Sequence, residues 1–203
     1  MTTTILRHVR PLGGAPTDIH IRDGRFVAPG PIPEGAALLD GGGLLALPAL
    51  VEAHTHLDKN LIGMPWYRND IGPLRQHRIE ADRRAKRELG IDPRRQSERQ
   101  VRQTLALGVT AIRSHVDVDT EIGIANIAGV LATRAALAGL VDIQLVAFPQ
   151  SGMLIRPGTL DLMQEALRLG ADVVGGIDPA AIDRNPCAHL DAIFALADRH
   201  AKP

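Results

Sequence analysis

Leu50-Val51-Glu52-Ala53-His54-Thr55-His56-Leu57-Asp58-Lys59 begins as an apolar, strand-like run and ends with two histidines separated by one residue. Successive side chains of a strand point to opposite faces, so His54 and His56 point the same way, about 6 to 7 Å apart along the strand. Two imidazoles on one face, where an apolar strand gives way to a polar loop, can chelate one divalent metal ion. An isolated His-x-His also occurs often by chance, so the surrounding sequence has to decide between a metal site and ordinary strand residues.

The length and composition are those of a protein with one sizeable core, or one core and a small appendage. The chain has 203 residues, of which 45% are hydrophobic, and no formal net charge. This charge balance gives no general attraction to nucleic acid or membrane, and 2% aromatic residues are too few for a base-stacking surface. There is no membrane-length apolar run and no signal-peptide pattern at the start. The single cysteine, Cys187, cannot form an internal disulfide, so we expect a cytoplasmic globular protein without nucleic-acid or membrane partners.

Residues 1–48 are expected to form a small β domain of their own. A turn at Asp23-Gly24 and a loop rich in Pro and Gly over 28–35 separate short runs typical of strands. The predicted strands cover residues 5–9, 18–22, 25–27 and 37–40. His8 and His20 alternate with apolar residues and are interpreted as ordinary residues of the strand surface.

From residue 49 onward, strands and helices alternate. After the strand that carries the histidine pair, strands are predicted at 110–117, 142–149 and 172–179. Helices are predicted over 74–107 with a break at 90–93, about 120–140, 159–169 and from Pro186 onward. This alternation implies parallel strands covered by helices. No Gly-x-Gly-x-x-Gly follows any strand, so the pattern favours a (β/α) barrel over an open dinucleotide-binding sheet.

Several helix boundaries carry recognisable end signals. Gly90 suits a C-cap, Asp92 an N-cap and Pro93 a first helical position, and Asn185-Pro186 starts the last helix. The arginine-rich helices over 74–107 are interpreted as a solvated outer face with local ion pairs rather than a nucleic-acid surface. In the last helix, four apolar residues are predicted to share one packed face: Leu190, Ile193, Phe194 and Ala197.

The surroundings of the histidine pair resemble the metal-dependent amidohydrolase superfamily. Leu47-Pro48-Ala49-Leu50-Val51-Glu52 leads straight into the pair and Leu-Asp-Lys follows it, as in the first barrel strand of that superfamily, with Ala49 in place of a common glycine. Runs at 113–119, 144–150 and 165–172 are similar to the cytosine deaminase branch. The matched runs cover nearly everything from about Ala37 to the C-terminus.

The resemblance implies an α/β fold that is the amino-terminal half of a TIM-type (β/α)8 barrel. About four βα units would occupy residues 49–203, preceded by part of a small β-sandwich over residues 1–48. A complete barrel needs about 250 residues. In the family, a third metal-binding histidine and the acid and base residues lie on later strands. We therefore expect that the 203 residues alone do not catalyse the family's reaction.

The resemblance also assigns roles to individual residues. His54 and His56 match metal ligands, Gln150 matches a position that hydrogen-bonds a planar substrate ring, and Leu74 matches an apolar contact in the pocket. The Gln150 amide can both donate and accept, which suits a ring presenting adjacent N–H and C=O groups. Further residues are expected on the active face without an assigned role: Lys59, His115, Asp117 and Asp178. For His115, a purely structural role is an equally good interpretation.

The implied activity is hydrolysis of a C–N bond of an amino-substituted pyrimidine or triazine, with one divalent metal ion (Zn or Fe) activating water. The H-x-E…P-C-x-x-C signature of the other zinc deaminase fold is absent. Two alternatives remain open. One is a non-catalytic half-barrel module that self-associates to close an exposed sheet edge, and we expect a homo-oligomer. The other is an amidohydrolase that cleaves a cyclic amide.

Overall fold

The computed structural model describes residues 2–68 and 71–203. The chain divides into two compact units, Met1–Pro48 and Ala49–Pro203. Within these described ranges, no helix combines the length and the apolar character that crossing a membrane requires.

The first unit is one small β-sheet. Its strands are β1 (Thr3–Pro11), β2 (Thr17–Arg22), β3 (Arg25–Val27), β4 (Ala37–Asp40) and β5 (Leu45–Ala46). The order is β3-β2-β1-β4, and β5 pairs with β1. β1 runs antiparallel to β2 and parallel to β4 and β5. The four predicted strands are confirmed, while the sandwich stays a prediction.

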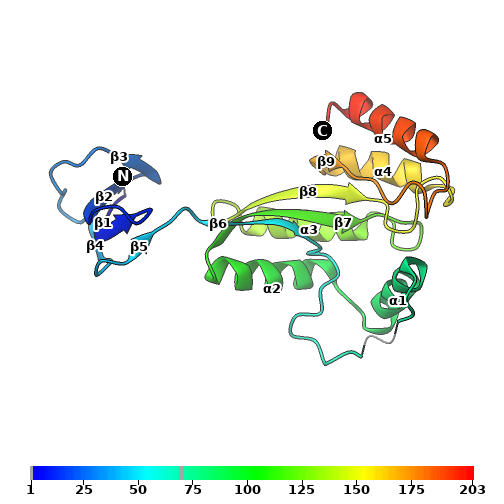
Figure 1. Ribbon diagram of the computed structural model, residues 1–203, viewed down its shortest axis with the longest axis horizontal. Coiled ribbons are helices and arrows are strands. Elements are labelled where there is room, and N and C mark those ends of the chain that lie inside the picture. The colour runs from blue at the N-terminus through cyan, green and yellow to red at the C-terminus, as the bar shows by residue number, and fades with distance from the viewer. Residues whose placement is uncertain (1, 69–70) are drawn as a thin grey trace. The chain divides into compact units, whose positions relative to one another are not determined.

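The second unit is a parallel sheet with helices between its strands (Figure 1). The strands are β6 (Leu50–Thr55), β7 (Val109–Asp117), β8 (Asp142–Phe148) and β9 (Val173–Val174), in the order β6-β7-β8-β9. The helices are α1 (Arg75–Glu88), α2 (Pro93–Ala106), α3 (Ala125–Ala136), α4 (Thr159–Leu169) and α5 (Pro186–His200). All three strand pairs are parallel, so the predicted parallel sheet with intervening helices is confirmed. Its closure into a barrel stays a prediction.

The core lies between the sheet and one layer of helices. α2 contacts α3, α3 contacts α4 and α4 contacts α5, and alternate residues of the strands point into this layer. On β7, Ile112 and Val116 are buried, whereas Arg113 between them is exposed on the opposite face. There the Arg113 Nε donates to the Gln144 Oε1 at 2.6 Å. The face that carries Arg113 therefore includes a polar pair of side chains.

Two helices begin where their capping signals predict. The Asp92 carboxylate accepts from the Arg95 N–H at 2.8 Å at the start of α2. The Asn185 amide oxygen accepts from the Ala188 N–H at 3.2 Å at the start of α5. At the end of α1 the C-cap is Leu89, and Gly90 follows it with a φ of +57°, so that prediction was one residue late.

The predicted start of α3 near Thr120 was wrong, because a turn occupies the first residues. The Asp119 Oδ1 accepts from the N–H groups of Glu121 at 2.8 Å and Ile122 at 3.3 Å. Gly123 has a φ of +58°, a conformation that favours glycine. The local side-chain hydrogen bonds compete with helix formation, and α3 begins only at Ala125.

Two predictions for the last βα unit also need correction. β9 is two residues long instead of eight, because the chain leaves the sheet after Gly175, whose N–H donates to the Ala147 carbonyl at 2.8 Å. In α5, Leu190 is 47% exposed and Phe194 is 64% exposed, so the predicted apolar face does not pack as one. The residues of α5 that are buried are His189 and Leu196.

Candidate active site

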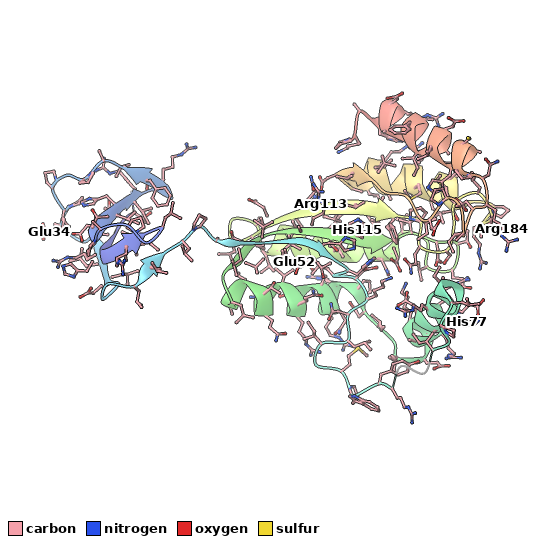
Figure 2. All side chains as sticks on the ribbon, in the orientation of Figure 1. Glu34, Glu52, His77, Arg113, His115 and Arg184 are labelled. Carbon is pink, nitrogen blue, oxygen red and sulfur yellow. The ribbon has the colours of Figure 1, made fainter. Side chains whose placement is uncertain are left out.

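Three histidines meet at the carboxyl ends of β6 and β7. His54 lies in β6, and His56 follows directly after that strand. His115 lies in β7 and is labelled in Figure 2. The rings of His54 and His56 have centroids 6.0 Å apart, and His115 is stacked on His54 at 4.2 Å. Phe148, at the end of β8, presents its ring at 5.7 Å from His56 and 5.5 Å from His115. The sheet therefore brings together three imidazoles from two neighbouring strands.

His115 is held neutral by its surroundings. Burial, together with the nearby His54, His56 and Arg113, lowers the pKa of His115 to about 4. Its Nδ1 is buried and has no hydrogen-bond partner among the described residues. A neutral imidazole stacked on His54 acts as a packing surface for that ring.

Asp117, at the end of β7, is the fully buried carboxylate behind His56. Its Oδ1 lies 3.5 Å from the His56 Nδ1, and neither of these buried atoms has a hydrogen-bond partner among the described residues. Its Oδ2 accepts from the Lys59 ammonium at 2.9 Å and from the Lys86 ammonium. Burial alone would raise the pKa of Asp117, but His56 and the two lysines outweigh it and hold this pKa well below its usual range. Asp117 is therefore ionised.

A second buried carboxylate, Asp58, stands next to the first. Its Oδ2 accepts from the Asn126 amide at 2.6 Å and from the Asp117 N–H at 3.0 Å. Burial and the negative charge of Asp117 raise the pKa of Asp58 to about 6, against the opposing effect of Lys59. Asp58 thus ties the strand ends of β6 and β7 to α3.

Two lysines and two carboxylates form a network that we call the lysine–carboxylate network: Lys59, Asp82, Lys86 and Asp117. The Asp82 Oδ2 lies 3.3 Å from the Lys59 Nζ and 3.1 Å from the Lys86 Nζ. The Lys86 side chain is only 9% exposed. Burial works to lower the pKa of Lys86, but the charges of Asp117 and Asp82 outweigh it and raise this pKa above its usual range. The network is thus internally charge-balanced, with two ammonium and two carboxylate groups.

Two donor sets could hold a divalent metal ion. Ligand atoms of His56, Asp58 and Asp117 all lie within 4.8 Å of one another. Both carboxylates of that set, however, already bind ammonium or amide groups, which an ion would have to displace. Among the described residues, the imidazoles of His54 and His56 have no ammonium or amide partner, and imidazoles are donors that suit Zn or Fe.

The environment of His56 fits a metal ligand. A carboxylate against Nδ1 favours the tautomer with the proton on Nδ1 and leaves Nε2 as the free base, as is usual for metal-binding histidines. The residues therefore fit one divalent ion, which His54 and His56 would hold. This ligand assignment stays a proposal.

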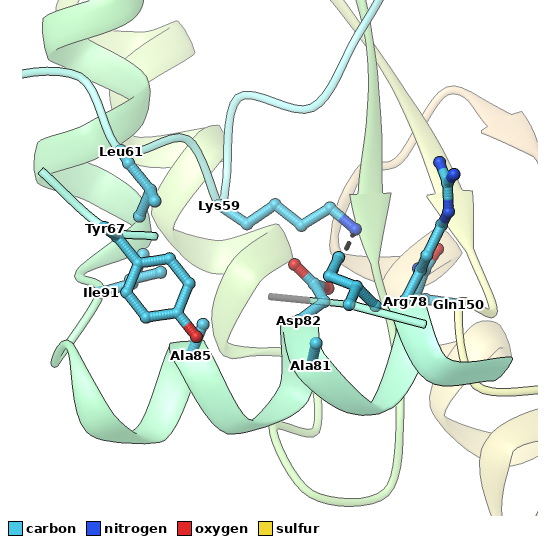
Figure 3. Close-up of a pocket in the computed structure, with 10 residues that line it drawn as sticks. Lys59, Leu61, Tyr67, Arg78, Ala81, Asp82, Ala85, Ile91 and Gln150 are labelled. Atoms are coloured by element: carbon cyan, nitrogen blue, oxygen red, sulfur yellow. Dashed lines mark hydrogen bonds and ion pairs between the residues drawn. The ribbon is translucent and has the colours of Figure 1, made fainter. Parts of the chain in front are cut away.

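A cavity of about 360 Å³ opens beside Lys59 (Figure 3). Gln150 lines it, together with Arg78 and Asp82 of α1, and the Lys59–Asp82 contact lies along its wall. The remaining wall is mainly apolar and contains Leu61, Tyr67, Ile71, Ala81, Ala85 and Ile91. One cavity thus offers ammonium, guanidinium and amide groups beside apolar surface, which suits a flat, polar heterocycle.

Two of the candidate residues lie elsewhere. Leu74 is 59% exposed and is not among the described residues that line this cavity. The Asp178 Oδ1 accepts from the N–H groups of Ala180 at 3.1 Å and Ala181 at 2.9 Å, so it caps a turn. The structure thus brings together His54, His56, Lys59, His115 and Asp117, with Gln150 in the adjoining cavity.

Sequence reasoning missed Asp58, Asp82 and Lys86. Asp58 lies within the histidine run itself, where its position next to a metal-site motif was the available signal. Lys86 is the one lysine in a helix otherwise rich in arginine, which singles it out in the sequence. Its burial depends on how α1 lies against the sheet ends, and no local pattern encodes that.

No family model matches the chain, but individual known proteins and solved structures are similar to it. The chain is 32% identical over 185 residues to the N-isopropylammelide isopropyl amidohydrolase of Pseudomonas sp. (strain ADP), covering 80% of this chain and 41% of that protein. The crystal structure of N-isopropylammelide isopropylaminohydrolase from Burkholderia multivorans ATCC 17616 matches 99% of this chain and 51% of its own, with 46% identity and a TM-score of 0.93. The crystal structure of 5-methylcytosine deaminase from Klebsiella pneumoniae, liganded with 5-fluorocytosine, matches 99% of this chain and 49% of its own chain. The identity is 32% and the TM-score is 0.74.

The chain belongs to the amidohydrolase superfamily, and the predicted family is confirmed. Within the superfamily it is similar to hydrolases that act on carbon–nitrogen bonds, namely an N-isopropylammelide isopropylaminohydrolase and a 5-methylcytosine deaminase. The chain spans about half the length of these relatives.

Proposed function

We propose that this chain contributes to a metal-dependent aminohydrolase that cleaves a C–N bond of an amino-substituted pyrimidine or triazine. The observation that carries the proposal is the His54–His56 pair at the end of β6, with His56 backed by Asp117, beside the cavity that holds Lys59 and Gln150. The relatives named for N-isopropylammelide and 5-methylcytosine support the substrate class.

Each part of the site has a proposed role. His54 and His56 bind one divalent ion, Zn or Fe, and this ion supplies the activation of water. Gln150 orients the ring, because its amide can donate to a ring nitrogen or carbonyl and accept from a ring N–H at once. The Lys59 ammonium faces the same cavity and can donate a hydrogen bond to a ring carbonyl or ring nitrogen. The apolar wall around Tyr67 covers the ring face or an alkyl substituent and keeps bulk water away.

The activity is proposed for the whole protein, because the chain spans about half the length of its relatives. Catalytic zinc sites use three protein ligands and keep one position open, and the His54–His56 pair supplies two. We therefore propose that the 203 residues alone bind the ion weakly and do not turn over substrate.

The test begins with the intact mass of the protein from its native cell, which defines the form to assay. We expect that form to retain one divalent ion per chain and to release ammonia or an alkylamine from cytosine, isocytosine or an aminotriazine. A His54→Ala variant should lose the ion and the turnover, and a Gln150→Leu variant should raise KM more than it lowers kcat. Opening of a cyclic amide without release of ammonia would support the cyclic-amide alternative instead.

A second candidate, a self-associating module, is favoured by the open edge of the sheet. β6 is an edge strand, and its Leu50 and Val51 side chains are 59% and 68% exposed. Exposed edges of this kind invite pairing with another chain. This candidate would be favoured over the enzyme if the protein held no metal and showed no turnover, and if its molecular mass in solution rose with concentration. Val51→Lys should then restore the monomeric mass.

A further inference from the structure

Helix α1 is attached to the rest of its unit by charged side chains. Among the described residues, no Cα of α1 lies within 8 Å of a Cα in another helix or strand. Ile79 and Ala85 are its buried apolar residues. Ion pairs connect α1 to neighbouring segments: Asp82 with Lys59, Lys86 with Asp117, and both Arg83 and Arg87 with Glu121. The contacts of α1 with Lys59 and Asp117 are thus charged contacts, in addition to the packing of Ile79 and Ala85.

Among the described basic side chains of α1, Lys86 is the one that reaches a buried carboxylate of the site. Its ammonium contacts the Oδ2 of Asp117, whose side chain is fully buried. Arg87, the next residue, is 63% exposed and binds Glu121, which is 41% exposed. Two neighbouring cations of one helix therefore make very different contacts, one inside the site and one at the surface.

Asp117 links Lys86 to His56, the proposed metal ligand. Its Oδ2 is shared by Lys59 and Lys86, which leaves its Oδ1 facing the His56 Nδ1 at 3.5 Å. A neutral imidazole has one N–H, and the partner of one ring nitrogen decides which nitrogen carries the proton. The orientation of the Asp117 carboxylate thus decides whether the His56 Nε2 is a free base.

We propose that Lys86 is a positioning residue for His56: its ammonium fixes the Asp117 carboxylate so that the imidazole keeps its proton on Nδ1 and presents Nε2 to a divalent ion. The inference rests on the metal site of the proposed function. Without Lys86, the buried Asp117 carboxylate keeps Lys59 as its sole ammonium partner in the described chain, and its Oδ1 is free to turn away from His56. Lys86 touches neither the ion nor the substrate in this arrangement and acts through Asp117.

The test is the tautomer of His56 in the metal-free 203-residue chain, which needs no activity. Histidine labelled with ¹⁵N and long-range ¹H–¹⁵N correlation spectra distinguish the two tautomers, and a His56→Gln variant assigns the signals. We expect the Nδ1–H form in the parent chain, a shift toward the Nε2–H form in Lys86→Met, and recovery in Lys86→Arg. Arg87→Met is the matched control, because it removes an ion pair of the same helix and should leave the tautomer unchanged.

A titration with Co²⁺ provides the second readout. Lys86→Met should weaken binding by about tenfold, as loss of an outer-shell partner usually does, and Arg87→Met by less than twofold. Circular dichroism checks that each variant is folded. If Lys86→Met does not fold, Lys86→Gln, a shorter neutral side chain, replaces it with the same expectation.

Two results would overturn the proposal: a Lys86→Met chain that keeps the Nδ1–H tautomer, or an equal change of tautomer in Arg87→Met. The second result would show that docking of α1 in general, and not Lys86, orients His56. A different result would show that the proposed metal site is wrong. In that case His54→Ala and His56→Ala leave Co²⁺ binding unchanged, while the tautomer experiment still decides the role of Lys86.

Discussion

Asp183 and His189 form a buried pair in which the His189 Nδ1 lies 2.6 Å from the Asp183 Oδ2. The pair joins the first turn of α5 to the loop after β8. The Asp183 Oδ1 accepts from the N–H groups of Met153 and Leu154, each at 3.0 Å. One carboxylate therefore fixes the loop that follows Gln150, the residue proposed to orient the substrate ring.

Replacement of Asp183 by Asn should destabilise the protein by about 1–3 kcal/mol, because it removes one carboxylate oxygen from a buried set of hydrogen bonds to His189, Met153 and Leu154. The free energy of unfolding from urea titration measures the effect. Asp191→Asn, on an exposed position of the same helix, should change it by less than about 0.5 kcal/mol. Equal effects of the two substitutions would contradict the anchoring role of Asp183.

At Gly175 the chain passes close to the backbone of β8. A Cβ added at Gly175 would lie 2.6 Å from the Ala147 carbonyl oxygen, which belongs to the backbone and cannot rotate away. We expect Gly175→Ala to destabilise the second unit by about 1–3 kcal/mol through overpacking. Gly30→Ala is the control, since a Cβ there meets nothing within 4 Å, and its unfolding midpoint should stay unchanged.

The donor set for the metal ion can be identified by paired substitutions. We expect His54→Ala to abolish retention of Zn²⁺ or Co²⁺ by the protein, because it removes one of two imidazole donors. The Asp58→Asn variant should retain the ion. Asp58 accepts hydrogen bonds from the Asn126 amide and the Asp117 N–H, and the amide oxygen of an asparagine can accept both. Elemental analysis after dialysis measures the metal content. The reverse outcome would assign the ion to the set formed by His56, Asp58 and Asp117.

The attachment of α1 should be sensitive to salt. Screening shortens the range of charge interactions from about 10 Å at 0.1 M salt to about 3 Å at 1 M, and exposed pairs such as Arg87–Glu121 feel it most. We expect hydrogen exchange of α1 amides to accelerate at 1 M NaCl. The amides of α2, which packs against α3, should keep their protection. Acceleration of both helices alike would mean that salt destabilises the whole unit.

The sequence predicted those features that depend on neighbouring residues. Asp92-Pro93 and Asn185-Pro186 start helices because the cap and the restricted proline φ act locally. The parallel sheet followed from the alternation of strands and helices. Asp119 shows the limit of this approach, because its turn occupies residues that otherwise read as helix.

Burial and side-chain partners were harder to predict. Phe194 is apolar but 64% exposed, and a local sequence pattern does not encode which face of α5 meets β9 and α4. Lys86 is charged but buried, and it was grouped with solvated arginines because its partner Asp117 is distant in sequence. His54 and His56 were found because both candidate donors lie within three consecutive residues, whereas Asp117 completes the arrangement from another strand.

The spatial order β6-β7-β8-β9 is also the order in which a ribosome makes these strands. Translation adds about 5–20 residues per second, whereas helices and short loops form within microseconds. Each new strand therefore meets a partner that was synthesised just before it and has had time to settle. The second unit can assemble vectorially during translation, one βα unit at a time, without waiting for a distant part of the polypeptide.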